Sequence, residues 1–413
     1  MTDTRFATIL KRGVAEVITE AELLRLLDSG RILTLKQGFD PSAPDIHLGH
    51  VVSLRKLRQF QELGHKVTLI VGDWTARIGD PSGQSATRPM LSPSEIESNA
   101  QTYMQQFFKV IDKDKTELRW QSEWFSRFTL EEVIKLTSKF TVARLLSRED
   151  FERRYSSGTP ISLTEMLYPL LQAYDSVVIK ADVEFGGTDQ KFNCLVGREL
   201  QQSMGQPPQQ VFLVPILIGI DGHHKMSKSL RNHIGVAEPP QEMYGKVMSI
   251  PDSLIVDYFE LVTDVPEEEI ADFNEQLKNH SANPMNLKKR LAHEIVRQFH
   301  SGQAANEAEE HFTRVFQKKE LPEEIPECVF AASYIGNELF QLDIAPTLVK
   351  EGLVKSIGEL KRLLAQKAIE LDGNKINSSI VNARQGSILK IGKRRFVRIV
   401  IRQADSNQQS AVS

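Results

Sequence analysis

The chain has 413 residues and a mass of 46.7 kDa, a length that predicts two to four domains rather than one hydrophobic core. Hydrophobic residues make up 40% and charged residues 25%, which excludes a disordered or fibrous chain. No uncharged apolar run approaches the roughly 18 residues that span a bilayer. The N-terminal segment lacks the apolar core of a secretory signal, and two cysteines cannot build a disulfide framework or a cysteine-based zinc site. We therefore expect a soluble, cytoplasmic protein without membrane contact.

The first half of the chain alternates strand-like and helix-like segments, which is typical of a parallel sheet with helical crossovers. Asp45 is a plausible N-cap, and Gly64 a plausible stop, for the helix that follows the first strand. We expect a doubly wound, Rossmann-like α/β domain with strands at 31–39, 67–71, 176–185 and 211–220 and helices at 46–63 and 164–174.

After about residue 235 the alternation of strand-like and helix-like segments gives way to helical patterns. Helical patterns rich in Glu and Lys extend over 240–316, and a Pro- and Glu-rich linker follows at 321–327. Two short helices and β-like pieces then form a small α+β module. The expected domains are a catalytic domain with an inserted helical connective segment (1–233), a helical domain (234–330), the α+β module (343–402) and a disordered tail (403–413).

Charge is unevenly distributed along the chain. Residues 343–402 contain 13 Lys and Arg against 5 Asp and Glu, so this module carries +8 while the rest of the chain carries −11. A small basic module on an acidic body indicates a polyanionic partner at this end of the chain. A basic surface that serves only solubility explains the composition equally well.

The segment His47-Leu48-Gly49-His50 begins the first expected helix of the parallel sheet. Histidines three apart share a helix face, and their ring donors join the free backbone N–H groups of a helix N-terminus, which suits the phosphates of a nucleotide. Gly49 lets a ligand lie close to the backbone. Taken alone the pair is more often two surface or core histidines than a site.

The segment Lys225-Met226-Ser227-Lys228-Ser229 follows the strand expected at 211–220. Two ammonium groups three residues apart on a Ser-rich loop can close over a triphosphate and neutralise charge on leaving pyrophosphate. An ordinary solvated loop is the alternative.

The two segments together are much more specific than either alone, because both follow strands of one parallel sheet. Their order resembles that of class I aminoacyl-tRNA synthetases, with a HIGH-type motif early and a KMSKS motif late. The chain resembles the bacterial-type tyrosyl-tRNA synthetases of the KMSKS-containing subgroup over most of its length. The resemblance rests on four segments: GFDPSAPDIHLGH (38–50), IGDPSG (78–83), YPLLQAYD (168–175) and GGTDQ (186–190).

The resemblance implies tyrosine–tRNA ligase activity with ATP as a substrate and no covalent enzyme intermediate. It implies that the phosphates and the reaction depend on His47, His50, Ser42, Lys225 and Lys228. ATP binding would also involve Gly49, with Asp189 at the ribose hydroxyls. The sequence shows no protein metal site, so Mg²⁺ would accompany ATP.

Tyr168, Gln172 and Asp175 are spaced by four and three residues, which places them on one helix face. By the resemblance, Tyr168 and Gln172 help hold the α-amino group of L-tyrosine, and Asp175 accepts from its phenol. The resemblance also implies that Asp80, with Thr75 as a weaker candidate, binds the ammonium group and Gln190 the carboxylate end. Helix packing alone would explain the spacing.

The basic module resembles the S4-type RNA-binding domain of these enzymes. Phosphate contacts to tRNA(Tyr) are expected from Lys355, Lys361, Arg362 and Lys367, and the helical domain is expected near the anticodon. The resemblance also implies a homodimer formed through the catalytic domain.

One residue departs from the family pattern. Many tyrosyl enzymes carry a second tyrosine for the substrate phenol two residues before Gly38, and this chain has Lys36 there. Two alternatives therefore stay open beside the ligase: a related ligase or nucleotidyltransferase with another amino-acid choice, and a synthetase-like RNA-binding protein without catalysis. Intact His47, His50, Lys225 and Lys228 argue against the second.

Overall fold

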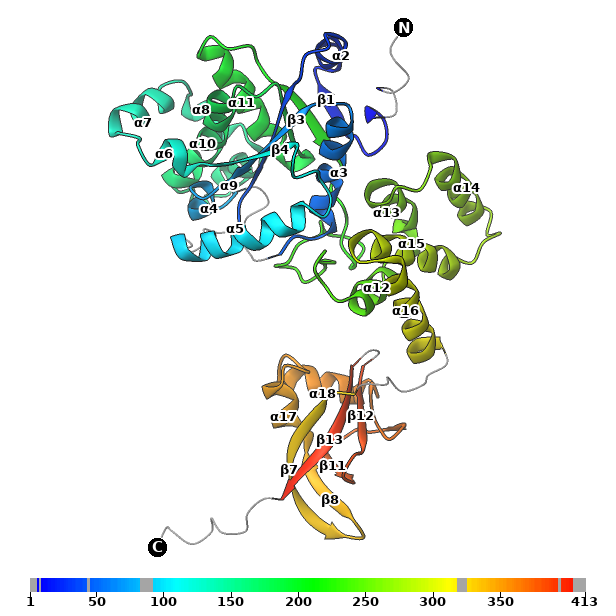
Figure 1. The fold of residues 1–413 in the computed structure, drawn as a ribbon. Helices are drawn as coiled ribbons and strands as arrows, with labels where there is room; N and C mark the ends of the chain where they lie inside the picture. Colours follow the sequence, from blue (N-terminus) through cyan, green and yellow to red (C-terminus); the bar gives the residue numbers. More distant parts are fainter. Residues whose placement is uncertain are drawn as a thin grey trace, which may run out of the picture. The chain divides into compact units, whose positions relative to one another are not determined.

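The computed structural model describes residues 6, 9–42, 45–81, 92–317, 325–392 and 395–403. By its internal contacts the chain divides into two compact units, Met1–Glu309 and Glu310–Ser413. Figure 1 shows the course of the chain within each unit, and each is described by itself.

The first unit is built on a six-stranded sheet in the order β1-β6-β5-β2-β3-β4, parallel except for β1 at one edge. In chain order the five parallel strands form the 3-2-1-4-5 arrangement of a doubly wound sheet. Successive strands are added in one direction from β2 to β4 and in the opposite direction from β5 to β6. The switch point lies between β2 and β5, and folds of this kind bind ligands there. The bounds are β1 Glu16–Ile18, β2 Thr34–Phe39, β3 Lys66–Val71, β4 Thr116–Trp120, β5 Val183–Gly187 and β6 Gln210–Val214.

Helices cover both faces of this sheet. Helix α3 lies on one face, and α11, with α10 packed against it, lies on the other (Figure 1), as expected when right-handed crossovers leave either side of the reversal. The bounds are α2 Glu20–Asp28, α3 Leu48–Glu62, α4 Thr75–Ile78, α5 Pro93–Phe107, α6 Ser122–Phe125, α7 Leu130–Thr137, α8 Val142–Leu146, α9 Glu149–Ser156, α10 Leu163–Ile179 and α11 Lys191–Ser203.

Two expected strands end elsewhere than the sequence predicts. The strand at 176–185 is wrong in its first half, because α10 continues to Ile179 and ends with Lys180 in the left-handed conformation at φ 50°. The strand at 211–220 stops at Val214 and is followed by Pro215. The N-cap of α3 is His47 rather than Asp45.

A helical segment completes the first unit. The Arg12 guanidinium donates to the carbonyl oxygens of Glu260, Val265, Phe259 and Thr263 at the end of α13, which ties the N-terminal segment to it. The predicted boundary at 233/234 therefore does not separate compact units. The bounds are α12 Pro240–Met248, α13 Ile255–Val262, α14 Glu267–Lys278, α15 Pro284–Phe299 and α16 Gly302–Phe312. The division between the units falls within α16, after Glu309, so the π-helical turn at Thr313–Gln317 is counted with the second unit.

The second unit packs two helices on a seven-stranded sheet in the order β10-β9-β12-β13-β7-β8-β11. Its core includes Phe330 and Leu342, which lie before the predicted start of the module at 343. The sheet of this unit therefore begins with β7 and β8, before residue 343. The predicted tail at 403–413 lies outside the described residues except Gln403, which ends β13. The bounds are β7 Glu327–Gly336, β8 Leu339–Asp343, α17 Ile344–Lys350, α18 Ile357–Ala365, β9 Ile369–Leu371, β10 Asn374–Lys375, β11 Ile380–Ala383, β12 Ile388–Ile391 and β13 Arg395–Gln403.

Candidate active site

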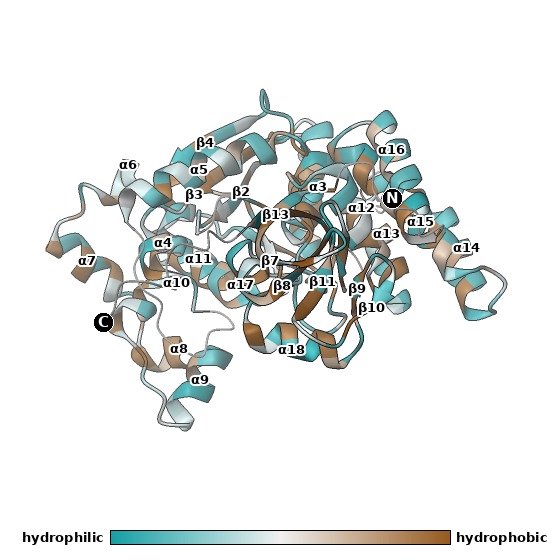
Figure 2. Ribbon diagram, turned by 90° about the horizontal axis from the view of Figure 1, so that it is seen from below, coloured by the Kyte–Doolittle hydropathy of each residue, from teal (hydrophilic) through white to brown (hydrophobic). Residues whose placement is uncertain are grey.

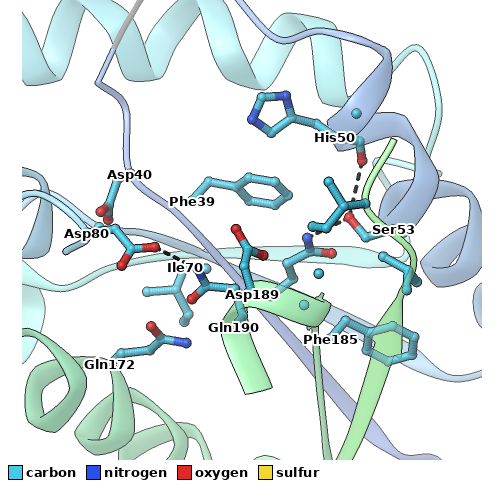
Figure 3. Close-up of a pocket in the computed structure, with 18 of the residues that line it drawn as sticks. Phe39, Asp40, His50, Ser53, Ile70, Asp80, Gln172, Phe185, Asp189 and Gln190 are labelled. Carbon is cyan, nitrogen blue, oxygen red and sulfur yellow. Dashed lines mark hydrogen bonds between the residues drawn. The ribbon is translucent and has the colours of Figure 1, made fainter. Parts of the chain in front are cut away.

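A cavity of about 350 Å³ opens at the switch point of the strand order, at the carboxyl ends of β2 and β5. Figure 3 shows His50 and Ser53 at one end of it and Asp80, Gln190 and Gln172 at the other. The predicted site residues that line the cavity are His47, Gly49, His50, Thr75, Asp80, Tyr168, Gln172, Asp175, Asp189, Gln190 and Lys225. Ser42 is exposed in the loop after β2 and, like Lys228, is not among the lining residues.

The two histidines at the start of α3 have defined tautomers. The backbone N–H of Gly49 donates to His47 Nδ1 at 3.2 Å, and the backbone N–H of His47 donates to His50 Nδ1 at 3.2 Å. Each Nδ1 is therefore an acceptor, so in the neutral rings both protons lie on Nε2, where they can be donated to a ligand. A Cβ atom at Gly49 would lie 3.0 Å from two atoms of the His47 ring, so the absence of a side chain there allows this packing.

Burial keeps both imidazoles neutral. It lowers the pKa of His50 to about 4, and it lowers the pKa of His47 further still, with His50 and His233 adding to the effect. At neutral pH this end of the cavity offers two neutral N–H donors beside the positive end of the α3 dipole.

The loop that carries the two lysines folds back toward this end. Asn232 holds it, donating to the carbonyl oxygen of Lys225 at 3.0 Å and accepting from the backbone N–H of Ser227 at 2.7 Å. Lys225 Nζ lies 3.1 Å from Asp189 Oδ2. Lys228 Nζ is buried and makes no hydrogen bond with the described residues, and burial lowers its pKa. A buried ammonium group without a hydrogen-bonding partner is costly, so the site favours binding of an anionic ligand.

Helix α10 presents its predicted polar face to the cavity. Tyr168 Oη donates to Asp40 Oδ2 at 2.8 Å, and Thr75 Oγ1 donates to the other oxygen of Asp40 at 2.6 Å. Burial raises the pKa of Tyr168, so its hydroxyl stays protonated. The sequence did not indicate Asp40 as a site residue, although it lies within the GFDP segment.

Asp80 lies opposite α10 and is held by two side chains. Gln190 Nε2 donates to Asp80 Oδ2 at 2.6 Å, and Arg148 donates to Asp80 Oδ1 at 3.2 Å. Arg148 is buried and also pairs with Asp150 at 2.7 Å. The structure thus brings the candidate residues Asp80 and Gln190 into contact, whereas Arg148, from the segment before α9, carried no motif signal.

Asp175 closes the inner end of the cavity. Its carboxylate accepts from Gln121 Nε2 at 2.8 Å and from Trp124 Nε1 at 3.2 Å. Burial raises the pKa of Asp175 to about 7, although Lys36 and the two hydrogen bonds oppose the shift. Gln121 lines the cavity beside Asp175 and was missed by the sequence analysis because no local pattern connects residues 54 positions apart.

Lys36 does not face the cavity. Its fully buried Nζ donates to the carbonyl oxygen of Gln172 at 2.7 Å and to Ser176 Oγ at 2.7 Å, and it pairs with Glu184 at 2.8 Å. Lys36 and Glu184 are also direct partners in the β2–β5 register. The residue that departs from the family pattern therefore links the sheet to α10 beneath the cavity.

The four cations predicted for RNA contact, Lys355, Lys361, Arg362 and Lys367, are all exposed on or beside α18 in the second unit.

None of the described helices has the length and apolar character needed to cross a membrane. Within the described part of the chain, no group of three His, Cys, Asp or Glu side chains is arranged to hold a metal ion.

Comparisons with known proteins identify the family of the chain. The sequence model of the family described as tRNA synthetases class I (W and Y) matches residues 28–317. The tyrosine–tRNA ligase of Dehalococcoides mccartyi (strain CBDB1) is 60% identical over 392 residues, covering 95% of this chain and 98% of that protein. That of Thermotoga maritima is 51% identical over 401 residues, covering 97% of this chain and 98% of that protein.

Solved structures share the fold. A C-terminally truncated mitochondrial tyrosyl-tRNA synthetase of Aspergillus nidulans superposes with a TM-score of 0.62 at 23% identity, over 76% of this chain and 95% of that one. The tyrosyl-tRNA synthetase of Archaeoglobus fulgidus, complexed with L-tyrosine, gives a TM-score of 0.59 at 23% identity, over 73% of this chain and 98% of that one.

The chain belongs to the class I tRNA synthetases of the tryptophan and tyrosine family. Within that family it groups with the bacterial tyrosyl-tRNA synthetases, because curated relatives 46–60% identical over nearly its full length are bacterial tyrosine–tRNA ligases. The resemblance and the doubly wound fold predicted from the sequence are confirmed.

Proposed function

We propose that this chain is a tyrosine–tRNA ligase. It activates L-tyrosine with ATP to tyrosyl-adenylate and then transfers the tyrosyl group to the 3′ end of tRNA(Tyr). The observation that carries the proposal is a single cavity with two neutral histidine donors and Lys225 at one end and Asp175 at its closed inner end. One end suits a triphosphate, and the other suits an amino acid with a polar tip.

In the first step, a carboxylate oxygen of tyrosine attacks the α-phosphorus of ATP, and the bond to the bridging oxygen breaks to release pyrophosphate. His47 and His50 donate to the phosphates through Nε2–H, while Lys225 and Lys228 balance the charge that grows on pyrophosphate. Lys225 leaves Asp189 to do so, which frees that carboxylate for the ribose hydroxyls.

ATP binding has further contributions in this proposal. Ser42 reaches the phosphates from the loop after β2, and Gly49 keeps the start of α3 open to the nucleotide. Mg²⁺ accompanies ATP and is held by its phosphates rather than by protein ligands.

The tyrosine substrate lies along α10 with its phenol at the inner end of the cavity. Its ammonium group is bound near Asp80, Tyr168 and Gln172, with Thr75 beside them, and its carboxylate end lies near Gln190. Asp175 accepts the phenolic hydrogen. Because an unpaired buried polar group is costly, this contact disfavours phenylalanine.

In the second step, a hydroxyl of the tRNA 3′-terminal ribose attacks the acyl carbon, and AMP leaves. The exposed Lys355, Lys361, Arg362 and Lys367 suit contacts with tRNA phosphates. The helical segment 234–330 contacts the anticodon region. Aminoacyl-tRNA is consumed in translation, so the chain works in the cytoplasm.

The enzyme is a homodimer in this proposal. Helices α7, α8 and α9 lie on one side of the first unit, and α7 and α8 carry hydrophobic residues (Figure 2). The side chains of Leu130 and Leu163 are 75% and 82% exposed, and Ile134, Val142 and Tyr155 are also exposed in this region. Exposed apolar residues gathered in this way are typical of a surface that a protein partner covers.

The test is ATP–pyrophosphate exchange with each of the twenty amino acids in the absence of tRNA. Exchange with tyrosine alone is expected. Exchange with another amino acid would instead support a related ligase of different specificity, and no exchange with any amino acid would support a catalytically inactive RNA-binding protein.

A further inference from the structure

A phenolic hydroxyl is both a hydrogen-bond donor and an acceptor, and both capacities need partners when it is buried. Under the proposed function, Asp175 accepts the phenolic hydrogen. An ionised carboxylate has no hydrogen to give back, so a second group must donate to the phenolic oxygen. Lys36, at the position where the family pattern has a tyrosine, is the first candidate for this donor.

The hydrogen bonds of Lys36 exclude it. An ammonium group has three hydrogens, and Lys36 Nζ has three acceptors within 2.8 Å, on Gln172, Ser176 and Glu184. It does not line the cavity. The indole of Trp124 has a single N–H, which already points to Asp175 Oδ1.

Gln121 has a hydrogen to give. Its Oε1 accepts from the backbone N–H groups of Trp74 at 3.2 Å and Thr75 at 2.9 Å. Backbone N–H groups can only donate, so these two bonds fix which end of the amide is oxygen. Nε2 therefore faces Asp175 and donates one hydrogen to Oδ2 at 2.8 Å.

The second hydrogen of Gln121 Nε2 has no acceptor among the described hydrogen bonds, and the residue lines the cavity at this point. We propose that Gln121 is a specificity-determining residue that donates this hydrogen to the phenolic oxygen of bound tyrosine. Asp175 and Gln121 then read the hydroxyl as a pair, one accepting and one donating. The inference rests on the proposed function, because it presumes a phenol at the inner end of the cavity.

The first test needs no mutation. The unmodified enzyme is assayed by ATP–pyrophosphate exchange with tyrosine, phenylalanine and 4-amino-L-phenylalanine. The ring amine donates to Asp175 but is a poor acceptor, so it loses the contact with Gln121. Its kcat/KM is expected to lie about 5- to 150-fold below that of tyrosine, the range for one unsatisfied buried group. Equal use of the amine and tyrosine would overturn the inference.

The second test compares Gln121→Leu with Gln61→Leu. Gln61 is a matched control, because it is equally buried and bonds Asp112 and Thr116 away from the cavity. In Gln121→Leu, the tyrosine-to-phenylalanine ratio of kcat/KM should fall about 5- to 150-fold, with most of the loss on tyrosine. Gln61→Leu should leave the ratio unchanged.

The outcomes separate the inference from its premise. If Gln121→Leu lowers kcat/KM for both amino acids by the same factor, Gln121 only supports the fold, and the inference is overturned. If the unmodified enzyme exchanges with an amino acid other than tyrosine, the proposed function fails, and the inference fails with it. If Gln121→Leu does not fold, the 4-amino-L-phenylalanine comparison alone decides.

Discussion

Asp175 shows how one buried carboxyl sets the chemistry of the inner end of the cavity. Burial raises its pKa to about 7, while Lys36, Gln121 and Trp124 favour its ionised form. Near neutral pH the group therefore sits between an acceptor-only carboxylate and a carboxylic acid that can donate. In the inference above, the ionised form accepts the phenolic hydrogen and Gln121 supplies the donor.

The raised pKa makes stability depend on pH. Because the folded pKa of Asp175 exceeds its ordinary value, its contribution is greatest at low pH and is lost as pH rises through about 7. Between pH 5 and pH 8 the free energy of unfolding should fall by about 2–3 kcal/mol relative to Asp175→Asn. Urea unfolding followed by tryptophan fluorescence measures this difference, since all three tryptophans (74, 120 and 124) lie in the first unit, together with Asp175. Parallel pH profiles for the two proteins would contradict it.

Lys36 should matter for stability rather than for reading the substrate. Lys36→Met leaves the buried Glu184 carboxylate without its cation, which should cost about 3–5 kcal/mol of unfolding free energy. Adding Glu184→Gln should recover part of the loss. Urea unfolding of the two variants and of Glu184→Gln checks this. If the single Lys36 variant were as stable as the unmodified chain, the ion pair would have no structural role.

At the scale of elements, the sequence predicted what local patterns encode. The apolar face of α3 and the short apolar run of β3 were found within two residues, because burial repeats along one segment. The extension of α10 to Ile179 was missed, since its Val-Val-Ile run favours a strand by intrinsic preference. The contacts of Asp80 with Arg148 and of Asp175 with Gln121 join residues 68 and 54 positions apart, and no local pattern reports them.

In the loop 225–229, the ammonium group of Lys228 makes no hydrogen bond with the described residues and is proposed to bind the phosphates of ATP. Lys228→Ala should lower the rate of ATP–pyrophosphate exchange about 10²- to 10³-fold, because it removes charge stabilisation of the leaving pyrophosphate. Binding of tRNA should persist, which a filter-binding assay can measure. Lys278→Ala, at the exposed end of α14, is the matched control and should leave exchange unchanged. Unaltered exchange in Lys228→Ala would remove this lysine from the reaction.

At the scale of the whole molecule, the proposed function places activation in the first unit and the tRNA phosphate contacts around α18 in the second, while most of the helical segment proposed to contact the anticodon belongs to the first. The cavity lies entirely in the first unit, whereas the four exposed cations around α18 lie in the second. The charge pattern located the second unit in the sequence. The charge pattern gives no sign of its N-terminal strands, because β7 and β8 carry little charge, and their pairing with β13 and β11 joins segments far apart in the chain.

This division makes the position of a truncation decisive. A chain that ends at residue 317 should keep tyrosine-dependent exchange within about twofold but lose most tRNA charging, and the loss should grow with salt because phosphate contacts are electrostatic. A chain that ends at residue 342 keeps β7 and β8 without β13 and β11, which exposes Phe330 and Leu342 and should cause aggregation. Exchange, charging at 50 and 200 mM salt, and size-exclusion chromatography measure the three effects. If the chain that ends at residue 317 still charges tRNA, the basic surface of the second unit binds another partner. In that case the full-length double variant Lys361→Ala, Arg362→Ala should also charge tRNA normally.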